Sequence, residues 1–126
     1  MTNTRIPAAP KDVGKLSLVL ASALDAVAGR TNSMSLVKAK AVVLVVVDGL
    51  GLQNLTDFAG HAPFLSQAQR ANPGAIRAEC PSTTVLSLAS IATGVRAGEH
   101  GLIGYTVLDS ISGERINLLS GWEQSD

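Results

Sequence analysis

The stretch Ala41-Val-Val-Leu-Val-Val-Val47, followed directly by Asp48-Gly49, decides the fold of this 126-residue chain. Seven apolar and mostly β-branched residues without polar alternation are typical of a strand buried on both faces, as in a parallel sheet covered by helices. Lys38 and Lys40 precede the run, and glycines follow it. We therefore predict a buried parallel strand over residues 41–47, with Asp48 at its carboxyl end.

Helices and shorter strands are predicted on both sides of this run. Apolar residues over 14–28 recur at the spacing of an amphipathic helix, which Gly29 is expected to end. The further predicted elements are helices over 52–59, 63–70 and 85–92, a strand over 75–80, a Gly-rich loop over 95–101, and a hairpin of 103–108 with 115–119. Alternating strands and helices predict the α/β class with a mostly parallel sheet. Residues 1–13 are expected to form an extended lead-in to this single domain.

The composition limits the classes of partner. Apolar residues make up 46% of the chain, and ten basic side chains balance ten acidic ones, so the sequence carries no electrostatic footprint for a nucleic-acid polymer or an anionic membrane. No apolar run approaches the ~20 residues of a membrane span. Cys80 is the only cysteine, which excludes an internal disulfide and favours a reducing, cytoplasmic location.

A secretory signal is the alternative interpretation of the first helix. Lys15, an apolar middle and Ala26-Val27-Ala28 resemble such a signal with its small-residue cleavage site. The long leader with two prolines, and Asp25 within the apolar stretch, favour a soluble helix instead. We therefore expect a cytoplasmic protein, with secretion as the alternative.

Two side chains are the strongest candidates for chemistry. Ligands of open α/β sheets bind beyond the carboxyl ends of strands, where Asp48 is expected, although a carboxylate there can also simply cap a turn. Thr84 follows Pro81-Ser82-Thr83 at the start of a predicted helix, whose free amides and dipole favour a phosphate. Ser82, Thr83 and Thr84 can equally serve as helix caps. Taken together, two strand ends of one sheet are expected to present Asp48 and Thr84 to one metal ion.

Four segments together resemble a known group of enzymes. They are Val-Val-Val-Asp-Gly-Leu-Gly (45–51), Cys-Pro-Ser-Thr-Thr (80–84), Ala-Thr-Gly (92–94) and Glu-His-Gly-Leu-Ile-Gly-Tyr (99–105). Over about residues 14–122 the chain resembles the alkaline phosphatase superfamily, and within it the nucleotide pyrophosphatase/phosphodiesterase (type I phosphodiesterase) branch. The resemblance implies a partial three-layer α/β/α fold and a zinc-dependent hydrolase of small-molecule phosphate esters or nucleotides.

The resemblance also implies roles for particular residues. Asp48 matches an aspartate ligand of a two-zinc site, and Thr84 matches the nucleophile that also contacts a metal; Thr83 is the alternative nucleophile, because the threonine is doubled. Ser87 stands where the branch has a phosphate-binding asparagine, and its hydroxyl can still donate to phosphate. That departure leaves the preference for nucleotide phosphodiesters open, so a phosphomonoesterase is an alternative. His100 matches a histidine that is structural in the family, and the chain places no partner ligands around it at metal-site spacing.

The further metal ligands of the family, which are aspartates and histidines, have no counterpart in residues 1–126. We therefore expect an incomplete domain that lacks its carboxy-terminal portion, exposes apolar surface and is inactive alone. A sulfatase is disfavoured because Cys80-Pro81 does not continue as Cys-x-Pro-x-Arg. A dinucleotide-binding module is disfavoured because Asp48-Gly-Leu-Gly51 lacks the Gly-x-Gly-x-x-Gly fingerprint. A non-catalytic fragment that associates through apolar surface is the third alternative. Glu79, Glu99 and Asp109 are expected to be solvated charges.

Overall fold

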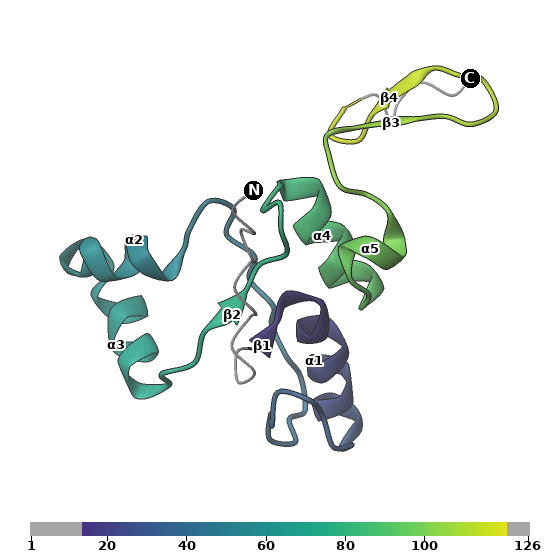
Figure 1. Ribbon diagram of the computed structural model, residues 1–126. Coiled ribbons are helices and arrows are strands. Elements are labelled where there is room, and N and C mark those ends of the chain that lie inside the picture. The colour runs from purple at the N-terminus through teal and green to yellow at the C-terminus, as the bar shows by residue number, and fades with distance from the viewer. Residues whose placement is uncertain (1–13, 121–126) are drawn as a thin grey trace, which may run out of the picture.

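The computed structural model describes residues 14–120, and Figure 1 shows helices joined by long connections and two very small sheets. The helices are η1 (Leu16–Leu18), α1 (Val19–Ala28), α2 (Leu52–Asp57), η2 (Ala59–His61), α3 (Pro63–Ala71), α4 (Thr84–Thr93) and α5 (Ala97–His100). The strands are β1 (Gly14–Lys15), β2 (Ile76–Arg77), β3 (Thr106–Leu108) and β4 (Arg115–Asn117). This mixture of helices and small sheets is consistent with an α/β domain. The lead-in predicted over 1–13 lies outside the described residues.

The two sheets differ in direction and in place. β1 pairs with β2 in parallel, and β3 pairs with β4 in antiparallel register, with Val107 opposite Ile116. The second pair confirms the predicted hairpin, which extends away from the helices in Figure 1. No helix of the described part of the chain is long and apolar enough to cross a membrane.

The core lies where α4 packs against η1 and α1. Leu86 and Ser90 of α4 are fully buried, and Ala26 of α1 is 1% exposed. Ser17 of η1 and Ser22 of α1 are buried beside them, and such small side chains let the helices approach closely. The sequence predicted both ends of this packing unit, since α1 ends at Gly29 and α4 ends at Gly94 with φ +75°. That left-handed conformation is one that glycine adopts without strain.

The predicted strand over 41–47 is wrong for the residues that the structure describes. The segment is irregular and exposed, with Val43 at 86% and Val45 at 74%, and it belongs to neither sheet. A strand that is buried on both faces depends on hydrogen bonds from neighbouring strands and on helices above and below it. Residues 14–120 place β1 and β2 against each other instead, so the mostly parallel sheet stays a prediction.

Two shorter segments also differ from their predictions. The strand predicted over 75–80 contracts to Ile76–Arg77, and the loop predicted over 95–101 contains α5. Glu99 is not merely a solvated charge, because its carboxylate accepts a hydrogen bond of 3.1 Å from the Arg96 amide and caps the first turn of α5. That local bond, together with the His100–Ser90 contact described below, explains why a helix forms in a Gly-containing segment.

Asp109 organises the turn between β3 and β4. Its carboxylate accepts hydrogen bonds from the Ser112 hydroxyl at 2.7 Å, the Ile111 amide at 3.0 Å and the Ser112 amide at 3.2 Å. The Ser112 hydroxyl, followed by the two amides, lowers the pKa of Asp109 below its ordinary value of 3.8. The turn is therefore a designed feature of the sequence, which the expectation of a solvated charge missed.

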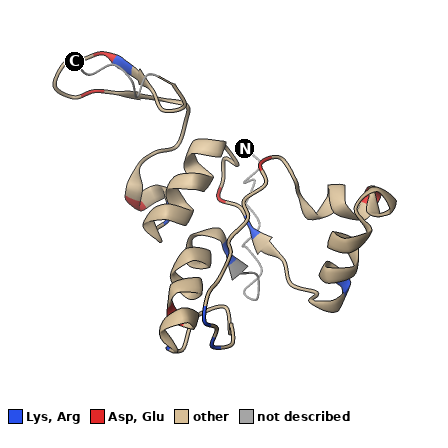
Figure 2. Cartoon of the chain, turned by 180° about the vertical axis from the view of Figure 1, so that it is seen from behind, with Lys and Arg blue, Asp and Glu red and all other residues tan. Residues whose placement is uncertain are grey.

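Charges are sparse on the packed helices. Figure 2 shows Lys, Arg, Asp and Glu scattered along the chain rather than gathered on one element. α4 carries none of the four, and α1 carries only Asp25, whose carboxylate pairs with Arg30 at 2.6 Å. The fold thus agrees with the composition in offering no broad basic surface.

Burial of Leu86 is expected to be the largest single contribution of α4 to stability. Leu86→Ala should lower the free energy of unfolding by about 2–5 kcal/mol, because it leaves a cavity in the only packed layer of the described chain. Leu88→Ala is the matched control on the same helix, since Leu88 is 46% exposed, and should cost under about 1 kcal/mol. Urea unfolding followed by circular dichroism measures both. Equal costs would contradict the packing.

The hairpin is expected to depend on pH through Asp109. Its folded-state pKa lies below the unfolded one, so its stabilisation is complete above pH 3.8 and is lost as the pH falls through the lower, folded value. Amide exchange of Ile111 and Ser112 should therefore accelerate on acidification beyond the intrinsic rate. Asp109→Ala should remove this dependence, and Asp57→Ala on α2 serves as the control. A pH profile that is the same in wild type and Asp109→Ala would contradict the turn geometry.

Candidate functional site

Asp48 lies at the turn that follows the apolar run. Gly49 has φ +73°, a conformation that side chains rarely adopt, although a Cβ there would meet nothing within 4 Å. Its requirement is therefore one of backbone conformation and not of space. Asn54 of α2 steadies the same turn, because its Oδ1 accepts a hydrogen bond of 3.0 Å from the Gly51 amide. The sequence stage missed Asn54, although a side-chain acceptor at the third position of a helix is a recognisable capping signal.

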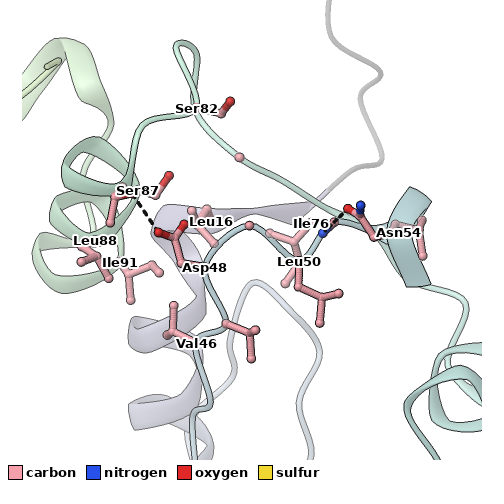
Figure 3. A pocket seen from close by; sticks show the side chains of 16 residues that line it. Leu16, Val46, Asp48, Leu50, Asn54, Ile76, Ser82, Ser87, Leu88 and Ile91 are labelled. Atoms are coloured by element: carbon pink, nitrogen blue, oxygen red, sulfur yellow. Dashed lines mark hydrogen bonds between the residues drawn. The ribbon is translucent and has the colours of Figure 1, made fainter. Parts of the chain in front are cut away.

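Thr84 is the first residue of α4, and its side chain contacts Asp48. The Thr84 hydroxyl donates a hydrogen bond of 2.9 Å to Oδ2 of Asp48, across 36 residues of sequence. Figure 3 shows the Asp48 carboxylate pointing toward the first turn of α4, with this bond dashed. The structure thus brings together the two residues that the sequence predicted to meet. Their roles as metal ligand and nucleophile stay predictions.

The neighbouring hydroxyls have different surroundings. Thr83 occupies the N-cap position of α4 with extended backbone, but it makes no side-chain cap; its hydroxyl donates instead to the Ile103 carbonyl at 3.2 Å. Ser82 is exposed farther along the loop, and in Figure 3 its side chain points away from Asp48. The predicted capping by Ser82 or Thr83 is therefore wrong, because Ile103 takes the Thr83 hydroxyl and no side chain caps this end of α4. Of the three hydroxyls, Thr84 alone contacts the carboxylate.

The contact lies in a cleft of about 740 Å³ between the turn, β2 and α4. Its walls are mostly apolar, and Asp48 is its only charged residue. The lining residues are Leu16, Val46, Val47, Asp48, Gly49, Leu50, Gly51, Leu52, Asn54, Ile76, Ala78, Ser82, Thr84, Ser87, Leu88 and Ile91. Ser87 lies one turn after Thr84 on the same face of α4, so both hydroxyls border one space.

The start of α4 supplies further donors. The first amides of a helix have no acceptor within it, and they carry the positive end of its dipole. An anion in the cleft would therefore meet amides and the Ser87 hydroxyl, but it would also meet the negative charge of Asp48. A phosphate group is compatible with this arrangement when a cation neutralises the carboxylate.

The ligand set for such a cation is small. Asp48 and Thr84 offer oxygen atoms 2.9 Å apart, close enough for both to bind one ion. Residues 14–120 contain no cluster of three or more His, Cys, Asp and Glu side chains. His100 does not contribute, since both of its ring nitrogens have hydrogen-bond partners within the chain. The described residues thus fit one side of a metal site.

Comparison with known families agrees with this geometry. The model of the Type I phosphodiesterase / nucleotide pyrophosphatase family matches residues 42–122, which include Asp48, Thr84 and Ser87. The chain therefore belongs to this family of hydrolases, which is consistent with a fragment of the nucleotide pyrophosphatase branch of the alkaline phosphatase superfamily. No curated protein and no solved structure matches it significantly.

Asp48 is expected to hold the side chain of Thr84 in one rotamer. Asp48→Ala should let the Thr84 χ1 angle average while Thr83 stays fixed, because Thr83 bonds to Ile103 instead. Three-bond couplings from the Cγ2 methyl to the backbone nitrogen and carbonyl carbon measure each χ1 separately. Asp57→Ala serves as a control for the loss of one charge. Averaging of both threonines, or of neither, would contradict the assignment of partners.

Proposed function

We propose that this chain carries the nucleophile side of a zinc-dependent phosphodiesterase or nucleotide pyrophosphatase with the three-layer α/β/α architecture of the alkaline phosphatase superfamily. The observation that carries the proposal is the 2.9 Å hydrogen bond between Thr84 and Asp48 at the start of α4. Membership of the hydrolase family over residues 42–122 supports it. The single, exposed Cys80 is compatible with work in the cytoplasm.

Thr84 attacks phosphorus in this proposal. Its hydroxyl proton passes along the existing bond to Oδ2 of Asp48, a new bond forms between Oγ1 and phosphorus, and the bond from phosphorus to the leaving oxygen breaks. Water then attacks phosphorus of the threonyl ester, and the bond to Oγ1 breaks as Thr84 regains a proton. One phosphate ester or anhydride and one water yield an alcohol or phosphate and a shorter phosphate ester.

The neighbouring groups of α4 bind the phosphoryl oxygens. Ser87 faces the same cleft as Thr84, and its hydroxyl donates one hydrogen bond to a phosphoryl oxygen. The first amides of α4 supply further donors along the helix axis. These donors serve best when the phosphoryl group gains charge during the reaction, which is how fixed dipoles accelerate such transfers.

Zinc, when bound, supplies charge neutralisation and lowers the pKa of oxygen nucleophiles. Oδ1 of Asp48 and the Thr84 oxygen are the atoms of this chain that would hold it. A catalytic zinc needs about three protein ligands, and a pair of ions needs more. We therefore propose that further carboxylate and histidine ligands come from polypeptide outside residues 14–120. The exposed apolar run over 41–47 supports that proposal, because such a run is normally covered.

The chain is expected to act only when those ligands are supplied. In a chimera, residues 42–120 would replace the matching segment of an active family member, with zinc present and a thymidine p-nitrophenyl phosphodiester as substrate. Thr84→Ala should lower kcat at least about 10³-fold, as loss of a nucleophile does. Thr83→Ala is the matched control and should retain most of the activity.

The isolated chain with excess zinc should show no turnover. Robust hydrolysis by the chain alone that survives Thr84→Ala would contradict the proposal. Faster hydrolysis of p-nitrophenyl phosphate than of the diester by the chimera would favour a phosphomonoesterase, which the change from asparagine to Ser87 leaves open. Concentration-dependent oligomers of the chain without any zinc dependence would favour an interaction fragment.

A further inference from the structure

His100 has both ring nitrogens engaged, at the end of α5. Its Nδ1 accepts a hydrogen bond of 3.0 Å from the Leu102 amide, so Nδ1 carries no proton. The neutral ring then carries its proton on Nε2, which lies 3.0 Å from Oγ of Ser90 and donates to it. The contacts thus assign one tautomer to His100.

This tautomer excludes a second nucleophilic site. A histidine that activates a serine must accept the hydroxyl proton, but Nε2 of His100 already holds one. Ser90 is also fully buried and out of reach of a substrate. His100 and Ser90 therefore do not form a catalytic pair, although their distance resembles one.

The segment that follows His100 runs back to the start of α4. Gly101 turns the chain with φ +74°, Leu102 donates to the His100 ring, and the Ile103 carbonyl accepts the hydroxyl of Thr83. Ser90 lies seven residues, or about two turns, after Thr83. Residues 100–103 thus form a brace along α4, fastened at Ser90 and at Thr83.

We propose that His100 is a positioning residue that decides which of the two threonines presents its hydroxyl to Asp48. The ring fixes the Leu102 amide, the next residue places its carbonyl, and that carbonyl holds the Thr83 hydroxyl away from the carboxylate. Thr84 is then left as the donor to Asp48. The catalytic consequence rests on the proposed function, whereas the conformational claim stands without it.

The two ring contacts can be separated by substitution. An asparagine places its Oδ1 near the position of Nδ1, so His100→Asn keeps an acceptor for the Leu102 amide and loses the bond to Ser90. A glutamine reaches toward Nε2, so His100→Gln keeps a donor for Ser90 and loses the acceptor for Leu102. His61→Gln is the matched control, because His61 lies in η2 against Phe58, away from α4.

The test uses the 126-residue chain without zinc or substrate. In the wild type, long-range proton–nitrogen spectra should show an unprotonated Nδ1 and a protonated Nε2 in His100. His100→Gln should let the Thr83 χ1 angle average, measured from the methyl couplings, and should speed exchange of the Leu102 amide. His100→Asn should keep Thr83 in its wild-type rotamer, and His61→Gln should change neither threonine.

Several results would overturn the proposal. A proton on Nδ1 in the wild type would do so without any variant, and so would a fixed Thr83 in a folded His100→Gln. Averaging in His100→Asn equal to that in His100→Gln would show that the ring acts only by packing. If His100→Gln fails to fold, the wild-type tautomer and His100→Asn decide.

Activity gives an independent reading in the chimera described above. There, His100→Gln is expected to lower kcat roughly 10- to 100-fold with little change in KM, since displaced reacting groups cost rate rather than binding. An unchanged kcat beside an averaging Thr83 would leave the conformational claim standing and refute its catalytic consequence. An inactive wild-type chimera would count against the proposed function and not against the brace.

Discussion

The packing of α4 against η1 and α1 is the constraint on which the rest of the structure depends. Leu86 is fully buried there, two residues after Thr84, so its burial sets how the helix is rotated about its axis. With Val85 and Leu86 turned inward, Thr84 and Ser87 face the cleft. Because the side chains of one helical face recur every three to four residues, one buried leucine orients two polar groups. The geometry of the candidate site is thus a consequence of core packing.

Electrostatics then decides what the cleft accepts. A helix start contributes about half a positive charge, whereas Asp48 contributes a full negative one, so the two do not cancel for an approaching phosphate. No lysine or arginine lines the cleft. The chain as a whole is neutral and attracts anions no better than cations. A phosphate-binding role for this surface therefore depends on a cation at Asp48, which is why the metal and the substrate belong to one proposal.

The sequence predicted local features better than pairing. The ends of α1 and α4 followed from Gly29 and Gly94, because a left-handed residue ends a helix by local means. The strand over 41–47 did not form, since its stability depends on neighbours that no local pattern supplies. The roles of Glu99 and Asp109 were local as well, and an acceptor three residues from its donor was the signal for each.

The candidate site was predictable in part. That Asp48 and Thr84 meet followed from the rule for strand ends, although the strand that motivated it is absent from the described residues. The choice between Thr83 and Thr84 did not follow, because it depends on a carbonyl twenty residues away. A doubled threonine carries no local asymmetry that would single out one hydroxyl.

The exposed apolar run and the Asp48–Thr84 contact are linked. Asp48 lies at the end of a segment without strand partners, so Gly49, the Asn54 cap beyond it and the bond from Thr84 are what place its carboxylate. A strand added on either side of residues 41–47 would bury the valines and fix the backbone before Asp48 at the same time. Such pairing would convert an exposed, singly bonded carboxylate into a preorganised one. Covering the sheet and completing the metal site are then a single event in the assembly of the proposed enzyme.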